Sequence, residues 1–126
     1  MKFVCLVNIT QNRVLCERCG VANNIWTRIR GLLGRKFLPD DEGLLISPCP
    51  SIHMWGMKFA IDVVFVTREN IVTDIIENIA PGRYYVAKAN QGKPFAAIEL
   101  AVGKIAASQT AIGDQIVVEQ TPFSSA

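Results

Sequence analysis

Short apolar runs separated by turn residues recur along the chain and predict a mainly β fold. Residues 3–9 and 14–21 form two such runs, and the polar segment between them is typical of a hairpin turn. Further runs lie at residues 44–47, 61–67, 71–77, 84–86, 95–102 and 115–119. Many short strands with turn signals between them favour a compact β-sandwich or a partly open barrel.

One segment departs from this pattern and predicts an amphipathic helix near residues 24–33. Its apolar residues recur at helical spacing, at Ile25, Trp26, Ile29, Leu32 and Leu33. Asn23 and Asn24 stand where an N-cap is expected, and Gly34 where a helix ends. Residues 103–109 could form one further helical turn.

Composition and length indicate one globular unit. The chain has 126 residues, of which 50% are apolar, and this is enough for a packed core. We therefore expect a single β-rich domain over residues 1–120. The polar residues 121–126 are expected to form a loose C-terminal tail.

The N-terminal residues and the cysteines predict a cytoplasmic protein. Residues 3–7 are too short an apolar run for a secretory signal, and no window is long enough to span a bilayer. Cytoplasmic thiols stay reduced. The chain's 4 cysteines are therefore expected to be free thiols or metal ligands before they are disulfides.

Charge is distributed unevenly, but it does not indicate a nucleic-acid-binding protein. Residues 1–36 hold seven basic residues and one acid, whereas residues 37–126 hold six basic and ten acidic residues. The simplest interpretation is that the two parts neutralise each other. No nucleic-acid-binding signature accompanies the basic residues, and we expect no nucleic-acid partner.

Residues 51–67 place polar and titratable side chains in an apolar run, which makes them the first candidates for a site. If residues 51–59 are extended, alternate side chains share one side, namely those of His53, Trp55 and Met57. Imidazole, indole and thioether groups in a row would make a good wall for a small-molecule pocket. The alternative is that these side chains only fill the core.

Two acids pose a related question, because each stands between apolar residues of a predicted strand. Asp62 and Glu99 need a partner if they are buried, and an arginine such as Arg30 or an indole N–H is expected to supply it. The two acids could also act as a general acid and base, which would suit a hydrolase. The predicted ligand-binding set is His53, Trp55, Met57, Asp62, Glu99 and Arg30.

A zinc-stabilised interaction domain is a further alternative. Its ligands would be Cys16, Cys19, Cys49 and His53, which have the residue types of a Cys₃His site. In a regular strand, however, Cys16 and Cys19 would face opposite sides.

Five spaced blocks of sequence resemble domain-of-unknown-function family 192. The blocks are RIRGLLGR at residues 28–35 with Glu42-Gly43, HMWGM at 53–57, IDVVF at 61–65, IEL at 98–100 with Gly103, and Gly113-Asp114. The resemblance covers roughly residues 21–118 and implies a mostly β, sandwich-like or barrel-like fold. It implies no established biochemical activity.

Together these observations predict a binding or accessory module and favour it over an enzyme. The ligand would be an unknown small molecule or protein, and the sequence holds no cofactor-binding motif. The oligomeric state is left open.

Overall fold

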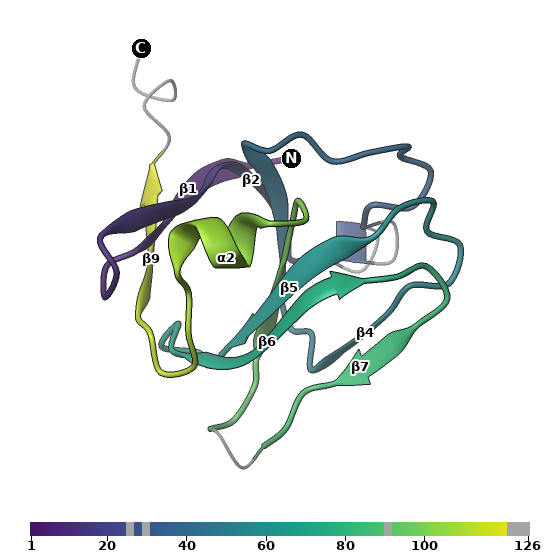
Figure 1. The fold of residues 1–126 in the computed structure, drawn as a ribbon. Helices are drawn as coiled ribbons and strands as arrows, with labels where there is room; N and C mark the ends of the chain where they lie inside the picture. The colour runs from purple at the N-terminus through teal and green to yellow at the C-terminus, as the bar shows by residue number, and fades with distance from the viewer. Residues whose placement is uncertain (25–26, 29–30, 90–91, 121–126) are drawn as a thin grey trace.

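The computed structural model describes residues 1–24, 27–28, 31–89 and 92–120. Within them the chain forms two β-sheets and a short helix (Figure 1). The strands are β1 (Phe3–Asn8), β2 (Arg13–Ala22), β3 (Glu42–Ile46), β4 (Ser51–His53), β5 (Ile61–Val66), β6 (Val72–Ile79), β7 (Tyr84–Val86), β8 (Ala96–Leu100) and β9 (Ile116–Gln120), and the helix is α2 (Lys104–Ser108). The predicted mainly β fold is confirmed.

The large sheet has seven strands in the order β6-β5-β8-β3-β2-β1-β9. All neighbours are antiparallel except β2 and β3, which are parallel. The sheet curls so that its two edge strands approach at one end. There the amides of Val72 and Ile116 donate to the carbonyls of Asp114 and Asn70, each at 2.9 Å. The result is a partly open barrel.

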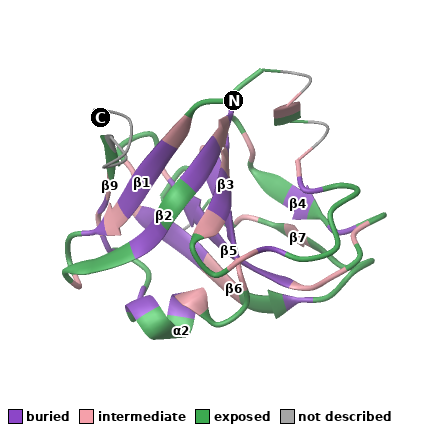
Figure 2. Ribbon diagram, turned by 90° about the horizontal axis from the view of Figure 1, so that it is seen from above, coloured by how far each residue is buried: buried purple, intermediate pink, exposed green. Residues whose placement is uncertain are grey.

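The large sheet carries an apolar core on each face, and its strands β5 and β8 are buried on both. On one face, Ile105 of α2 packs with alternate residues of the strands, such as Val64 and Ile98. On the other face, Val63 and Phe65 pack with Leu32 and with residues around β4 and β7. Figure 2 shows β5 buried along its length, and every residue of β8 is buried as well. A strand that is covered on both faces reads as a continuous apolar run, as residues 61–66 do.

The small sheet consists of β4 and β7, and a buried acid fastens it to the large sheet. The Tyr85 hydroxyl donates to Oδ2 of Asp74 at 2.6 Å, and the Tyr85 ring lies 5.8 Å from that of Phe65. Burial, followed by the contact with Asp74, raises the pKa of Tyr85 to about 12. The small sheet thus forms a second layer over β5 and β6, on the side of the large sheet away from α2 (Figure 1).

Strand β2 is bulged, and this corrects one expectation. Val4 pairs with Cys19 and Leu6 with Cys16, so β2 has one more residue than β1 between these pairs. A bulge of this kind shifts the side-chain alternation by one residue. Both cysteines consequently face the same core, and the expectation that they face opposite sides is wrong.

The predicted helix near residues 24–33 is only partly covered by the described residues. Thr27 and Arg28 are helical, and the Asn24 side chain accepts the Thr27 amide at 3.0 Å, as an N-cap does. Residues 25–26 and 29–30 of the prediction lie outside the described residues, as does the predicted tail at 121–126. Across the described ranges, no helix is long and apolar enough to cross a membrane.

Candidate functional site

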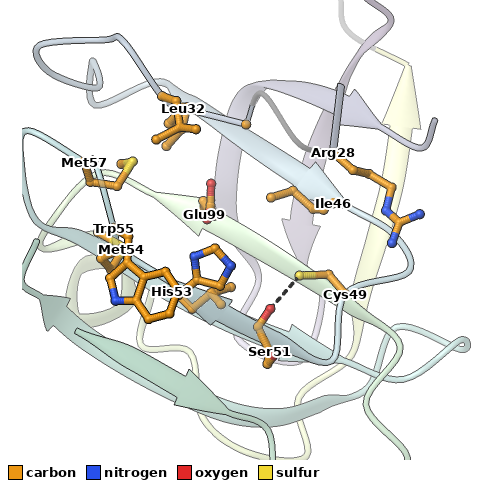
Figure 3. A pocket seen from close by; sticks show the side chains of 13 residues that line it. Arg28, Leu32, Ile46, Cys49, Ser51, His53, Met54, Trp55, Met57 and Glu99 are labelled. Carbon is orange, nitrogen blue, oxygen red and sulfur yellow. Dashed lines mark hydrogen bonds between the residues drawn. The ribbon is translucent and has the colours of Figure 1, made fainter. Parts of the chain in front are cut away.

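A cavity of about 130 Å³ opens between the small sheet, the ends of β3 and β8, and the segment around Leu32. Its wall combines apolar and aromatic side chains with polar ones in similar measure (Figure 3). The described lining residues are Arg28, Gly31, Leu32, Leu33, Ile46, Cys49, Ser51, Ile52, His53, Met54, Trp55, Met57 and Glu99. We call this cavity the Glu99 pocket.

A tight turn after β4 forms the aromatic wall of the Glu99 pocket. The Met57 amide donates to the Met54 carbonyl at 3.1 Å, and Gly56 between them has φ 79°. A positive φ at this position is the geometry of a type II turn, which favours glycine. The turn places the His53 and Trp55 rings in a stack with centroids 4.8 Å apart. Residues 51–59 are therefore not one extended strand, yet His53, Trp55 and Met57 line one pocket.

Glu99 lies among the other labelled side chains and is the acid of this pocket (Figure 3). It pairs with Val63 across β8 and β5, and so faces the same side of the sheet as the Val63 core. The residue is only 8% exposed, and burial raises the pKa of its carboxyl group from 4.5 to about 7. No side chain or amide among the described residues forms a hydrogen bond or ion pair with this carboxyl group.

Asp62 is the other candidate acid, and the register of β5 and β8 places it on the opposite face. It pairs with Leu100, one residue along from the Val63–Glu99 pair, and the side chains of a strand alternate. Its oxygens accept the amides of Asn78 at 2.8 Å and of Gly103 and Ile105 at 3.1 Å. Asp62 does not line the Glu99 pocket, and backbone amides, instead of the expected arginine or indole, satisfy it.

These contacts give Asp62 a structural explanation. Asn78 has φ 55° and lies at an irregularity in the pairing of β6 with β5, where its amide turns toward Asp62. Gly103 and Ile105 lie at the start of α2, where helix amides have no intrahelical acceptor. One carboxylate thus holds β6 and α2 against β5. The expected acid–base pair with Glu99 is not formed, because the two side chains point to different faces.

Two ionisable residues of the described pocket lining, Arg28 and Cys49, were not in the predicted ligand set. Arg28 is exposed and lies near Cys49, whose thiol donates to the Ser51 carbonyl at 3.0 Å (Figure 3). Burial raises the pKa of Cys49. The sequence signals for Arg28 were the excess of basic residues over residues 1–36 and its place in the RIRGLLGR block at residues 28–35. The predicted Arg30 lies outside the described residues.

The four proposed zinc ligands are divided between the two faces of the sheet. Cys16 and Cys19 are in the core that includes α2, where the contact with Cys16 and burial raise the pKa of Cys19. Cys49 and His53 line the Glu99 pocket. In the part of the chain that the structure describes, no three His, Cys, Asp or Glu side chains are grouped to hold a metal ion.

With this geometry in view, the chain was compared with known proteins. Residues 7–118 match the model of domain-of-unknown-function family 192 (DUF192), described as "Uncharacterized ACR". The chain belongs to the DUF192 family. A relative from Thermococcus sibiricus, named "UPF0127 protein", is 33% identical over an alignment of 118 residues, and the match covers 88% of this chain and 72% of the relative. The resemblance of the five sequence blocks is thereby confirmed.

Two solved structures share the DUF192 fold seen here. A protein of unknown function from Novosphingobium aromaticivorans has a TM-score of 0.76 and 24% identity, and the match covers 91% of this chain and 83% of that one. A protein from Sinorhizobium meliloti, titled as a transcription regulator, has a TM-score of 0.75 and 20% identity, covering 93% and 92%. At these identities the likeness concerns the fold alone. The family has no known function, and none of these relatives supplies one.

Proposed function

We propose that this DUF192 protein is a binding module whose Glu99 pocket receives a small organic ligand. One observation carries the proposal: the carboxyl group of Glu99, a residue only 8% exposed, faces a pocket of apolar, aromatic and polar side chains and has no hydrogen-bonding partner among the described residues. Within the described residues the fully buried side-chain oxygen that lacks a partner is Oδ1 of Asp74, so the Glu99 oxygens border the open space of the pocket, where a partner from outside can reach them.

The other lining residues support recognition of a small molecule. Leu32, Ile46 and Met54 offer apolar surface, while the His53–Trp55 stack offers flat aromatic faces. Ligand pockets usually combine such surface with a few convergent polar groups. A volume of about 130 Å³ is small, so the pocket suits a compact molecule or one group of a larger one.

Exposure of Trp55 is a second unusual feature, because 65% of this large apolar side chain contacts solvent. Together with Tyr84, which is 71% exposed, it leaves aromatic surface uncovered beside the pocket. A ligand that covers Trp55 would bury apolar area worth about 25 cal/mol per Å². Binding there would thus combine apolar burial with a polar contact to Glu99.

A fragment screen by NMR tests the proposal. The Trp55 indole N–H signal is identified with the variant W55F, and fragments that shift it are ranked by affinity. We expect Trp55→Ala and His53→Ala to weaken each such fragment, with the affinity for every variant measured from the backbone amide shifts of the pocket residues. The matched control is Phe37→Ala, because Phe37 is also an exposed aromatic residue (66%) but does not line the Glu99 pocket. If the two pocket variants leave the fragment affinities unchanged, the Glu99 pocket is not the binding site.

If the protein is a hydrolase instead, Glu99 is the better candidate of the two acids for its general acid or base. Its pKa of about 7 would suit a general acid or base at neutral pH, and His53 lines the same pocket. Asp62 is a poor base in this position because backbone amides occupy both of its oxygens. A broad hydrolase screen in which Glu99→Gln abolishes an activity would favour this alternative over simple binding.

A reducing compartment such as the cytoplasm suits the proposed module. All 4 cysteines are free thiols. In an oxidising compartment, the free and half-buried thiol of Cys49 in the pocket wall would be open to oxidation.

A further inference from the structure

The ionisable side chains of the Glu99 pocket differ in depth. Among the described lining residues these are Arg28, Cys49, His53 and Glu99. Glu99 is buried, whereas Arg28 is exposed and carries a guanidinium group. Cys49 is a neutral thiol because burial raises its pKa. The pocket thus places a fixed positive charge at its mouth and an acid inside.

A primary ammonium group is the best complement to Glu99. Ionised Glu99 offers only acceptors, and an ammonium group offers three donors together with a positive charge. The aromatic faces of Trp55 and His53 and the thioether of Met57 line the same space. Aromatic faces attract cations, and polarizable thioethers pack against the methylene groups next to them.

The dimensions of the pocket indicate where the rest of the ligand lies. A cavity of about 150 Å³ holds benzene, so this one, at about 130 Å³, encloses roughly six non-hydrogen atoms. A ligand whose ammonium group reaches Glu99 therefore has its other end at the mouth. Arg28 stands there with a planar guanidinium group that can bind a carboxylate through two parallel hydrogen bonds.

We propose that the Glu99 pocket binds a small zwitterionic amino acid, with its ammonium group on Glu99 and its carboxylate on Arg28. This inference rests on the proposed function and names the ligand class for the same site. A plain carboxylic acid would bring a second negative charge to Glu99. A neutral amide would bind only while Glu99 carries a proton.

Four probes with the same four-carbon chain separate these cases, namely 4-aminobutyrate, butylamine, butyramide and butyrate. Each is titrated at pH 7.5 into ¹⁵N-labelled full-length protein, and the Trp55 indole N–H shift is followed. We expect 4-aminobutyrate to bind most tightly and butylamine next. Butyramide and butyrate should bind at least about tenfold more weakly than 4-aminobutyrate, because each lacks the ammonium group.

Two variants divide the contacts. Glu99→Gln should weaken 4-aminobutyrate and butylamine alike, by about tenfold or more. Arg28→Gln should weaken 4-aminobutyrate by a similar factor and leave butylamine unchanged. Glu77→Gln and Arg13→Gln are the matched controls, since both residues are exposed and neither lines the pocket. An amide spectrum like that of the wild type establishes that each variant is folded.

The titrations distinguish failure of the zwitterion proposal from failure of the proposed function. Equal affinity for butyramide and 4-aminobutyrate, or a Glu99→Gln variant that binds as Glu77→Gln does, overturns the zwitterion proposal. If none of the four probes shifts Trp55 while other fragments do, the ligand class is wrong and the binding pocket stands. If no compound of either set shifts Trp55, the proposed function fails together with this inference.

Discussion

Replacement of Asp62 by asparagine should destabilise the protein without affecting the Glu99 pocket. The carboxylate accepts the Asn78 amide on one oxygen and those of Gly103 and Ile105 on the other. An asparagine has one acceptor oxygen and one donor group of nearly the same shape. Its best orientation keeps the two bonds to the start of α2 and turns an NH₂ group toward the Asn78 amide.

The size of the effect follows from these contacts. A hydrogen bond to a charged group contributes about 1.5–3 kcal/mol, and one such bond is lost while two lose their charge. Asp62 is fully buried, so water does not replace the missing acceptor. We expect Asp62→Asn to lower the free energy of unfolding by about 2–4 kcal/mol, which is a large part of the roughly 5–15 kcal/mol of a typical domain.

Urea unfolding followed by circular dichroism at pH 7 measures this difference. Asp41→Asn is the matched control, because Asp41 is exposed and its replacement should change the free energy of unfolding by no more than about 0.5 kcal/mol. In the folded Asp62→Asn protein, any fragment that binds beside Trp55 should keep its affinity. A variant as stable as the Asp41→Asn control would refute the structural role. A loss of fragment binding in the folded variant would restore Asp62 to the binding set.

Three further outcomes follow from the packing of the described residues. Burial gives Glu99 a folded-state pKa of about 7 against an ordinary 4.5, so its contribution to stability is complete below pH 4.5 and is lost as the pH rises through 7. Between pH 5 and pH 8 the wild type should therefore lose about 2–3 kcal/mol relative to Glu99→Gln in urea unfolding, and parallel curves for the two proteins would contradict the burial. Cys49 is the one cysteine of the four that is not buried, so a thiol reagent should modify one site in the native protein. Because the thiolate is the reactive form, the modification should become faster as the pH rises, and Cys49→Ser should abolish it. A methyl group at Gly43 would lie 2.7 Å from the Glu99 carbonyl oxygen, so Gly43→Ala should lower the free energy of unfolding by about 1–3 kcal/mol, and an unchanged midpoint in urea would contradict the close approach of β3 to β8.

The strands were predictable because their side chains alternate or run apolar over short lengths. The hairpin of β1 and β2, the covered strand β5 and the single turn of α2 all lie where the sequence predicts them. The candidates His53, Trp55, Met57 and Glu99 also line one pocket, since polar exceptions in apolar strands are uncommon and each needs an explanation. How these residues bind a ligand stays a prediction.

The remaining features depend on register and on tertiary contacts, which a single sequence does not contain. Asp62 and Glu99 look equivalent in sequence, and a pairing of β5 with β8 that differs by one residue would exchange their faces. The bulge that turns Cys16 and Cys19 to one side has no sequence signal of its own. Backbone amides donate to the Asp62 carboxylate, and because every residue type except proline has such an amide, the sequence does not indicate which ones do so. Arg28 and Cys49 reach the pocket from segments that no strand pattern joins.

The titration of the Glu99 carboxyl group tests the central claim most directly. The ¹³C signal of its side-chain carboxyl carbon is followed from pH 3 to pH 9 in the protein without ligand, with Glu99→Gln identifying the signal. We expect a midpoint near pH 7, because burial raises the pKa of this carboxyl group to about 7. A midpoint at or below its ordinary value of 4.5 would show that a cation of the protein already neutralises Glu99, and the pocket would then have no unmet charge for a ligand to satisfy.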